Sequence, residues 1–295
     1  MQKKASKKRV SKKCFFYIGK TDDFELTKDN YYSIEANRHY CSVHTYLDFF
    51  GSIGSKGCEA RALATLKGEY KKEDTDALLV GSFVDSYFEG TLDFFKFNHR
   101  EIYTKTGTLR APFKQAESMI DRVSVDKVFM DYMSGEKQVI MTGNLFSLDW
   151  KIKIDSLLMN GKEPIGIVDL KTTGKPLTQT WYSNDYGKVG FIEYWGYDIQ
   201  LALYQKIVEI NTGKQVPCFV AGIVKDDNPD FNVIYIPQQL LDTALNLLKM
   251  NCETFKNLIT EKMEVVGCGL DSCEYCKSTK VLEKAINYND LIDFA

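Results

Sequence analysis

The chain has 295 residues with 44% hydrophobic and 13% aromatic content, enough to bury one large core, and a formal net charge of only -2. No apolar run reaches the roughly 18 residues that a membrane-spanning helix needs, and no apolar signal region opens the sequence. These features exclude a membrane-spanning protein, give no sign of secretion, and lead us to expect one main cytoplasmic domain.

Basic residues are concentrated at the N-terminus. No acidic residue precedes Asp22, and seven lysines and arginines fall in the first thirteen residues: Lys3, Lys4, Lys7, Lys8, Arg9, Lys12 and Lys13. Of 38 basic and 40 acidic residues, these seven leave 31 basic residues against the 40 acidic ones, and an acidic body attracts nucleic acid poorly. We expect residues 1–23 to form a flexible tail, which either contacts DNA or acts as a solubilising extension.

Helices are expected first along the chain. Apolar spacing predicts a helix over residues 40–50, and strong helix formers predict another over 58–68, ending near Gly68. A helical period over 77–95 places Gly81, Asp85 and Glu89 along one stripe. Further helices are expected between Lys114 and Met133.

Strands dominate the middle of the sequence. Alternating or continuous apolar runs predict strands over 137–143, 148–158 and 164–171, followed by a loop and a helix over 194–210. Two more strands, over 219–225 and 231–237, precede a final helix over 239–261. This order, with no internal repeat, predicts an α/β fold in which a mixed sheet is flanked by helices.

Two acidic residues and a lysine occur at the ends of neighbouring strands. Asp155 lies near the end of one predicted strand, and Asp169 and Lys171 lie in the next, after the apolar run Ile165 to Val168. Burying a carboxylate beside such a run is costly unless a metal or a base compensates its charge. Carboxylates that hold Mg²⁺, with a lysine beside an attacking water, suit the hydrolysis of phosphodiesters, although a lone D-x-K triplet also fits a solvated strand edge.

Four short motifs follow one another along the chain. They are Gly81-x-x-x-Asp85, Asp155, Asp169-x-Lys171 and Gln200-x-x-x-Tyr204. In this order and spacing the chain resembles the RecB-type branch of the PD-(D/E)XK nucleases, and most closely the phage and prophage exodeoxyribonuclease VIII-like proteins, which are similar to lambda exonuclease. The resemblance extends from about Leu26 to about Lys280. It implies a restriction-endonuclease-like fold with a nuclease core over 24–262, including an N-terminal helical part, and a C-terminal cysteine-containing segment over 263–295.

The resemblance implies roles for the acidic residues and the lysine. In the family, the residues matching Asp155 and Asp169 bind Mg²⁺ or Mn²⁺, and the lysine matching Lys171 orients or activates the attacking water. The carbonyl of Leu170 would be a further metal ligand, and so would Asp85. RecB-type nucleases usually have histidine where this chain has Asp85, but a carboxylate suits a hard cation. His39, His44 and His99 lie outside the motifs and are expected on the surface or in the core.

The resemblance also implies contacts with DNA. A spacing of four places Gln200 and Tyr204 on one helix face. Gln200 would touch the lysine or a phosphate and Tyr204 the DNA backbone, although a half-buried structural face is the alternative. Thr172 and Thr173, directly after the lysine, are further DNA-binding candidates.

Cysteines form a second group of candidate ligands. Cys268, Cys273 and Cys276 lie in a short glycine-containing segment of the kind that wraps a metal. Several RecB-type nucleases hold a [4Fe-4S] cluster with one cysteine before the core and three after it, and on that resemblance Cys58 would be the fourth ligand. Zinc is the competing metal, and free thiols remain an alternative because the C-x4-C-x2-C spacing departs from the usual cluster spacing.

The expected function is Mg²⁺-dependent exonuclease digestion of linear duplex DNA in phage-type recombination. The resemblance suggests 5′ to 3′ polarity, a phage single-strand annealing protein as a partner, and a ring-shaped homo-oligomer. Two alternatives stay open at this point. One is a catalytically inactive nuclease-fold scaffold that binds DNA, and the other is an endonuclease or flap-cutting enzyme.

Overall fold

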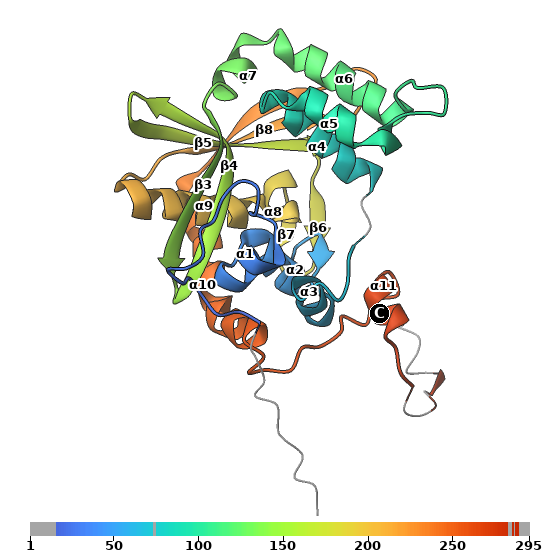
Figure 1. The fold of residues 1–295 in the computed structure, drawn as a ribbon, viewed down its shortest axis with the longest axis vertical. Helices are drawn as coiled ribbons and strands as arrows, with labels where there is room; N and C mark the ends of the chain where they lie inside the picture. Colours follow the sequence, from blue (N-terminus) through green and yellow to red (C-terminus); the bar gives the residue numbers. More distant parts are fainter. Residues whose placement is uncertain (1–15, 73–74, 283–284, 286, 289–295) are drawn as a thin grey trace, which may run out of the picture.

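The structure, a computed structural model, describes residues 16–72, 75–282, 285, 287 and 288. The seven lysines and arginines of the first thirteen residues lie outside the described residues. Among those described, no helix is both long enough and apolar enough to cross a membrane. The described elements form a central sheet with a layer of helices on each face (Figure 1).

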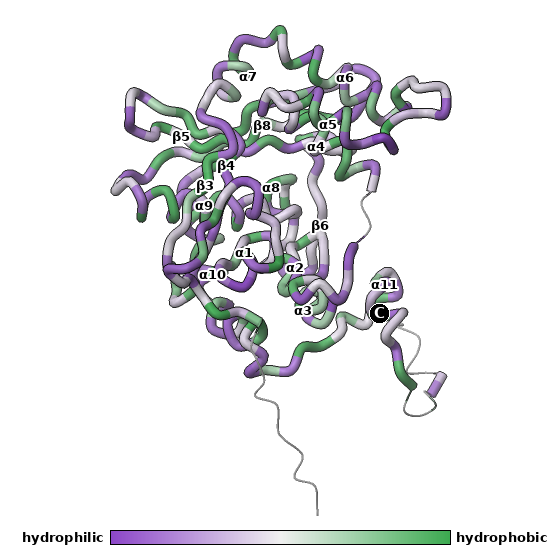
Figure 2. The backbone as a smooth tube through the Cα atoms, viewed as in Figure 1, coloured by the Kyte–Doolittle hydropathy of each residue, from purple (hydrophilic) through white to green (hydrophobic). Residues whose placement is uncertain are grey.

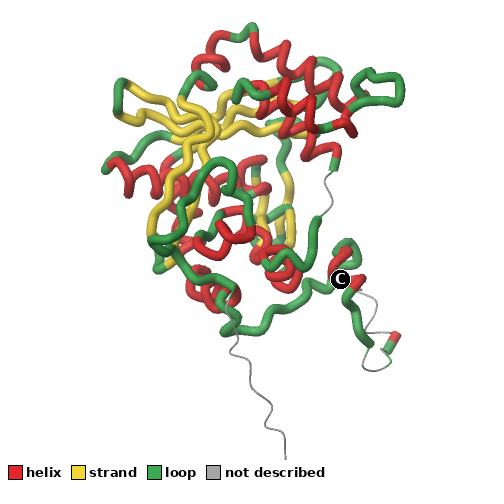
Figure 3. The backbone as a smooth tube through the Cα atoms, in the orientation of Figure 1, coloured by secondary structure: helices red, strands yellow, loops and turns green. Residues whose placement is uncertain are grey.

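The central sheet has five strands in the order β3-β4-β5-β8-β9. Their bounds are β3 Glu136–Leu145, β4 Leu148–Asn160, β5 Glu163–Thr173, β8 Cys218–Val224 and β9 Phe231–Ile236. All neighbouring pairs are antiparallel except β5 and β8, which are parallel. A parallel pair needs a crossover connection, and the helices between β5 and β8 supply it. Figure 3 shows these strands meeting in the middle of the molecule.

Four helices cover one face of the sheet: α4 Asp76–Phe88, α5 Leu92–Asn98, α6 Ala111–Ser124 and α7 Lys127–Tyr132. They bury Phe83, Phe113 and Met119 against Val168 and Leu170 of β5. The single helix expected over 77–95 is two helices, because the chain turns at Gly90 with a φ of 75° before α5 begins. A 3-10 turn over Arg100–Ile102 links α5 to the next segment.

The opposite face carries the larger core. It is covered by α1 Ile34–His39, α2 Val43–Phe50, α3 Glu59–Leu66, α8 Phe191–Trp195, α9 Tyr197–Thr212 and α10 Gln238–Ile259. Trp150 and Ile152 of β4 pack there against Phe255 and Leu203. The hydrophobic colouring of Figure 2 is concentrated in the strands that lie between the two helical layers. The helix expected over 194–210 is divided at Gly196, whose φ of 72° ends α8 and begins α9.

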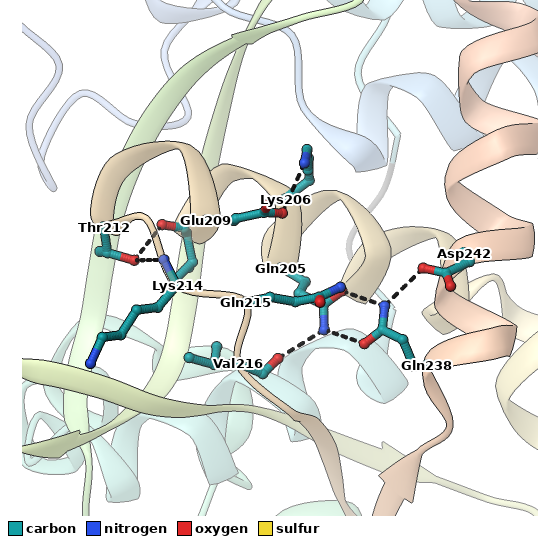
Figure 4. Close-up of polar contacts among 10 residues, drawn as sticks. Gln205, Lys206, Glu209, Thr212, Lys214, Gln215, Val216, Gln238 and Asp242 are labelled. Atoms are coloured by element: carbon teal, nitrogen blue, oxygen red, sulfur yellow. Dashed lines mark hydrogen bonds and ion pairs between the residues drawn. The ribbon is translucent and has the colours of Figure 1, made fainter.

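An amide network fixes α9 to its neighbours (Figure 4). The buried Gln205 donates to the carbonyl of Val216 at 2.8 Å and to Gln238 Oε1 at 2.9 Å. Gln238 returns a hydrogen bond to Gln205 Oε1 at 2.9 Å and donates to Asp242 at 2.9 Å. The buried amide of Gln205 is thereby satisfied, so the network holds α9 in one position against α10 and the segment that enters β8.

Four short strands and two short helices, α1 and α11, lie outside the predicted elements. Two strands, β1 Gly51–Ser52 and β2 Ser55–Lys56, form a hairpin after α2, and two more, β6 Trp181–Ser183 and β7 Gly187–Val189, form a hairpin in the loop after β5. Helix α11, Glu274–Ser278, lies beside α3 at the C-terminal side of the described chain (Figure 1). The mixed sheet flanked by helices confirms the expected fold class, and the elements expected over residues 40–261 are all present apart from the two breaks described above.

Candidate active site

The candidate active site lies where β4 and β5 separate. Pairing between these strands reaches Ser156 opposite Val168 and stops there. Asp155 and Asp169 are the next residue on each strand, so both carboxylates lie at the fork. Because the fork frees the backbone N–H of Leu170 from pairing with β4, this N–H donates to Asp155 Oδ2 at 2.9 Å.

Lys171 and Gln200 converge on the carboxylate of Asp169. Lys171 Nζ lies 2.7 Å from Asp169 Oδ2, and Gln200 Nε2 donates to Asp169 Oδ1 at 2.7 Å. Asp169 is 2% exposed, and Gln200 reaches it from the first turns of α9. The structure therefore brings Asp155, Asp169, Lys171 and Gln200 together, as the sequence predicted.

A third carboxylate faces the same space from α4. Burial and the charge of Asp155 raise the pKa of Asp85 well above its usual range, although Lys171 opposes the shift. Burial and the charge of Asp169 likewise raise the pKa of Asp155 to about 6. Burial would lower the pKa of Lys171, but Asp169 and Asp155 outweigh it, so the pKa of Lys171 is raised and the side chain is cationic.

The charges of this group fit a divalent cation. When all are ionised, three carboxylates beside one ammonium carry a net charge that a divalent cation would neutralise, and carboxylate oxygens are the ligands that Mg²⁺ and Mn²⁺ prefer. Asp169 Oδ2 is buried, and its polar partner among the described residues is the ammonium of Lys171. A cation bound to Asp169 Oδ2 would therefore compete with Lys171 for this oxygen.

Backbone strain is present directly beside Asp155. Gln138 of β3 has a φ of 52°, is 8% exposed, and its Nε2 lies 3.4 Å from Asp155 Oδ1. A positive φ costs of order 1 kcal/mol or more for a residue that is not glycine, and such strain clusters at functional sites. The other side-chain atom, Gln138 Oε1, is buried without a hydrogen bond among the described residues. Sequence reasoning missed Gln138, because nothing in the pattern of β3 marks it.

Two further residues near the lysine were also missed. The ring centre of Tyr197 lies 4.9 Å from Lys171 Nζ, which favours the ammonium form. His44 on α2 is exposed to solvent, yet the surrounding protein and the charge of Lys171 lower its pKa to about 4. His44 is therefore neutral near pH 7. The helix over 40–50 was predicted, but no spacing rule indicated that its histidine would approach β5.

The remaining DNA-binding candidates lie in different surroundings. Tyr204 is 4% exposed, so its contact with DNA stays a prediction. The hydroxyl of Thr173 accepts from Lys175 N at 3.0 Å and donates to the Lys175 carbonyl at 3.2 Å, which closes a local turn. Thr172 is half-buried and faces Gly81 of α4.

The four cysteines of the second candidate site also come together. The sulfur of Cys58 lies 3.6 Å from that of Cys276 and 4.0 Å from that of Cys273, and Cys268 lies 3.8 Å from Cys276. All four sulfurs lie within 4.8 Å of one another. Backbone contacts hold the strand-like segment before them on α3, because Ala60 donates to the carbonyl of Val266 at 3.2 Å.

A mixed sheet that forks at two aspartates, with a lysine on the same strand and a glutamine from the following helix, defines the PD-(D/E)XK nuclease fold. Residues 42–279 match a family described as a PDDEXK-like domain of unknown function (DUF3799), and the chain belongs to this family. No protein of curated function matches the sequence.

A solved structure agrees with this assignment. A crystal structure from Eubacterium rectale, of a protein described as a "Putative exonuclease", is 45% identical to this chain. Its TM-score is 0.87, over 92% of this chain and 100% of the other. A second solved structure, of SSO0001, is 11% identical over 68% of this chain and 85% of that one, with a TM-score of only 0.25.

Proposed function

We propose that this protein is a divalent-metal-dependent exonuclease that hydrolyses phosphodiester bonds of linear duplex DNA. The observation that carries the proposal is the fork of β4 and β5, where Asp155, Asp169 and Lys171 meet and Asp85 adds a third carboxyl group. The similarity to a protein described as an exonuclease supports the same activity.

Asp155 and Asp169, with Asp85 and the carbonyl of Leu170, are the proposed ligands of Mg²⁺ or Mn²⁺. When bound, such a cation polarises the scissile phosphate, lowers the pKa of an attacking water and stabilises the leaving oxygen. The protein supplies the positions of these groups. The Leu170 N–H orients Asp155, and Gln200 orients Asp169, so neither carboxylate has to reorganise during the reaction.

Lys171 has two tasks in this proposal. Its ammonium compensates part of the buried negative charge in the absence of a cation. Released from Asp169, it would donate hydrogen bonds to the attacking water or to the phosphate oxygens, where negative charge develops. The neutral imidazole of His44, near the same lysine, adds no charge that would compete with a cation.

The direct test is incubation of the purified protein with linear duplex DNA and Mg²⁺, beside the variants Asp169→Ala and Lys171→Ala. We expect degradation by the parent protein and its loss in both variants. Binding without cleavage in both Mg²⁺ and Mn²⁺ would instead favour an inactive scaffold. Closed circular DNA separates an exonuclease, which spares the circle, from an endonuclease. A 5′ to 3′ polarity, a role in phage-type recombination, a single-strand annealing partner and a ring-shaped oligomer are finer parts of the proposal, and end-labelled substrates test the polarity first.

We further propose that the four cysteines hold one structural Zn²⁺. Tetrahedral coordination at a Zn–S distance of about 2.3 Å places sulfurs about 3.8 Å apart, which matches separations of 3.6, 3.8 and 4.0 Å. A [4Fe-4S] cluster, the other expected group, has iron and sulfide between its cysteine ligands and would need the sulfurs considerably farther apart. The bound ion would fix the C-terminal segment to the first turn of α3.

A further inference from the structure

A small cavity opens beside the candidate active site. Its volume is about 280 Å³, and it is lined by residues of α4 and α5 together with Tyr32 and Lys153. Asp85, the third carboxylate of the active site, forms part of its wall. A group bound in this cavity would therefore lie next to a phosphate bound at Asp155 and Asp169.

Two exposed aromatic rings stand at the cavity. Tyr32 is 74% exposed and Phe94 is 71% exposed, so both rings are open to solvent. Exposed aromatic faces near a basic group are the standard means by which proteins hold unpaired bases, since every base has a π-face. The basic group is present, because Lys153 Nζ lies 4.7 Å from the centre of the Tyr32 ring.

The ring of Tyr32 is held in place from beneath. Its ring centre lies 4.9 Å from that of Tyr31 in an edge-to-face arrangement with an interplanar angle of 81°. Tyr31 is itself fixed, because the buried ammonium of Lys151 donates to its carbonyl and also to Asn37 Oδ1 at 2.8 Å. A buried lysine whose hydrogen-bond partners in the described chain are a carbonyl and an amide rather than a carboxylate is costly, and here it anchors the segment that presents Tyr32.

The charges of the cavity select a neutral occupant. Asp85 and Glu89 line it together with Lys153, so the opposite charges largely offset one another and a phosphate group gains little by entering. Ser82 and Asn98, which also line it, offer hydrogen-bond donors and acceptors for the edge of a planar ring. The volume is close to the lower limit of about 300 Å³ for small-molecule pockets, which suits one base with its sugar and excludes a base pair.

We propose that this cavity binds one unpaired nucleobase of the DNA strand being cut, with Tyr32 and Phe94 as stacking partners. The inference rests on the proposed nuclease function and deepens it, because it requires the end of a duplex to open before hydrolysis. Lys153 then lies between the stacked base and the active site, where its charge faces the sugar-phosphate backbone.

The test uses DNA that carries the fluorescent base 2-aminopurine at each of the last three positions of either strand. Binding is followed with the full-length Lys171→Ala protein in Mg²⁺, so that the DNA stays intact, and the same protein is combined with Tyr32→Ala, Phe94→Ala or Phe97→Ala. Phe97 is the matched control, because it is exposed on the same helix as Phe94 but does not line the cavity. Turnover of the single variants is measured in parallel.

We expect a fluorescence change at one terminal position, retained in the Phe97→Ala combination and weakened about tenfold or more in the Tyr32→Ala and Phe94→Ala combinations. Tyr32→Phe should restore it, since the ring and not the hydroxyl stacks. Unchanged binding in both cavity variants would overturn the inference while the nuclease function stands. If the parent protein cuts no DNA, the nuclease proposal fails, and the fluorescence arm still decides whether the cavity holds a base. Saturation by deoxyadenosine monophosphate without any response to DNA would also overturn the inference.

Discussion

Replacing Gln200 with alanine tests how the active site is held together. The change removes the 2.7 Å hydrogen bond to the buried carboxylate of Asp169. A hydrogen bond to a charged group contributes about 1.5–3 kcal/mol to the free energy of unfolding. Loss of an orienting partner of a metal ligand lowers metal affinity or activity about 10- to 100-fold. We therefore expect Gln200→Ala to lose about 2 kcal/mol of stability by urea unfolding and at least tenfold in DNA degradation rate.

Gln205→Ala is the matched control on the same helix. Gln205 is equally buried, and its loss leaves the carbonyl of Val216 and the amide of Gln238 without their partner, at a similar cost of about 1–3 kcal/mol. Its amide network joins α9, α10 and the segment entering β8 (Figure 4), and none of its hydrogen bonds involves Asp169. Gln205→Ala should therefore match Gln200→Ala in stability but keep its activity. Equal losses of activity in the two variants, or full activity in Gln200→Ala, would refute a positioning role for Gln200.

Three further predictions concern other sites. Lys171→Ala should lower the rate of DNA cleavage by a factor of at least 100 while DNA binding in a gel-shift assay persists; a rate near that of the parent protein would contradict the proposed task of the lysine. Burial and the charge of Glu193 raise the pKa of Asp198 to about 6. Because this folded-state pKa lies above the unfolded value, the contribution of Asp198 to stability is lost as pH rises from about 4 to about 6. Asp198→Asn should therefore stabilise the protein by about 1–3 kcal/mol at pH 8 and by little at pH 4. Asp185→Asn, at an exposed position, is the control and should not show this pH-dependent gain. The same gain at both pH values in Asp198→Asn would argue against burial of the charge. Elemental analysis should find one zinc per chain, and Cys58→Ser should abolish it and lower the Tm. Cys218→Ser, outside the cysteine cluster, should keep the metal. A brown parent protein that contains iron would show that the cysteines hold an iron–sulfur cluster instead of zinc.

The positions of the strands along the chain could be predicted because they depend on local pattern. The same holds for the two aspartates, Asp155 and Asp169, that the fork brings together. The run Ile165 to Val168 is buried on both faces of the sheet apart from Ile165, and its abrupt end at Asp169 is visible in the sequence. The spacing from Gln200 to Tyr204 likewise places both on one helix face. Such features need no knowledge of long-range contacts.

The rest of the site depends on distant contacts that no local pattern encodes. Gln138 faces Asp155 only because β3 pairs with β4 in one register, and its positive φ is imposed by that tertiary setting. His44 comes near Lys171 because α2 packs on the face of the sheet that also carries α9. The breaks at Gly90 and Gly196 were missed for a different reason. The apolar period continues through both glycines, so the pattern alone does not reveal the left-handed conformation that divides each helix.

The hairpin that joins β4 to β5 limits how the chain can change in length. Successive residues of a strand point to opposite faces, so one residue inserted between Asp155 and Met159 would turn the aspartate away from its partner across the fork. The turn at Gly161 and Lys162 is exposed and lies beyond the last pair, Asn160 with Glu163, so extra residues there leave the register untouched. The tip of this hairpin is therefore a position at which a peptide tag or a fluorescent label can be introduced, whereas the strand behind it must keep its residue count.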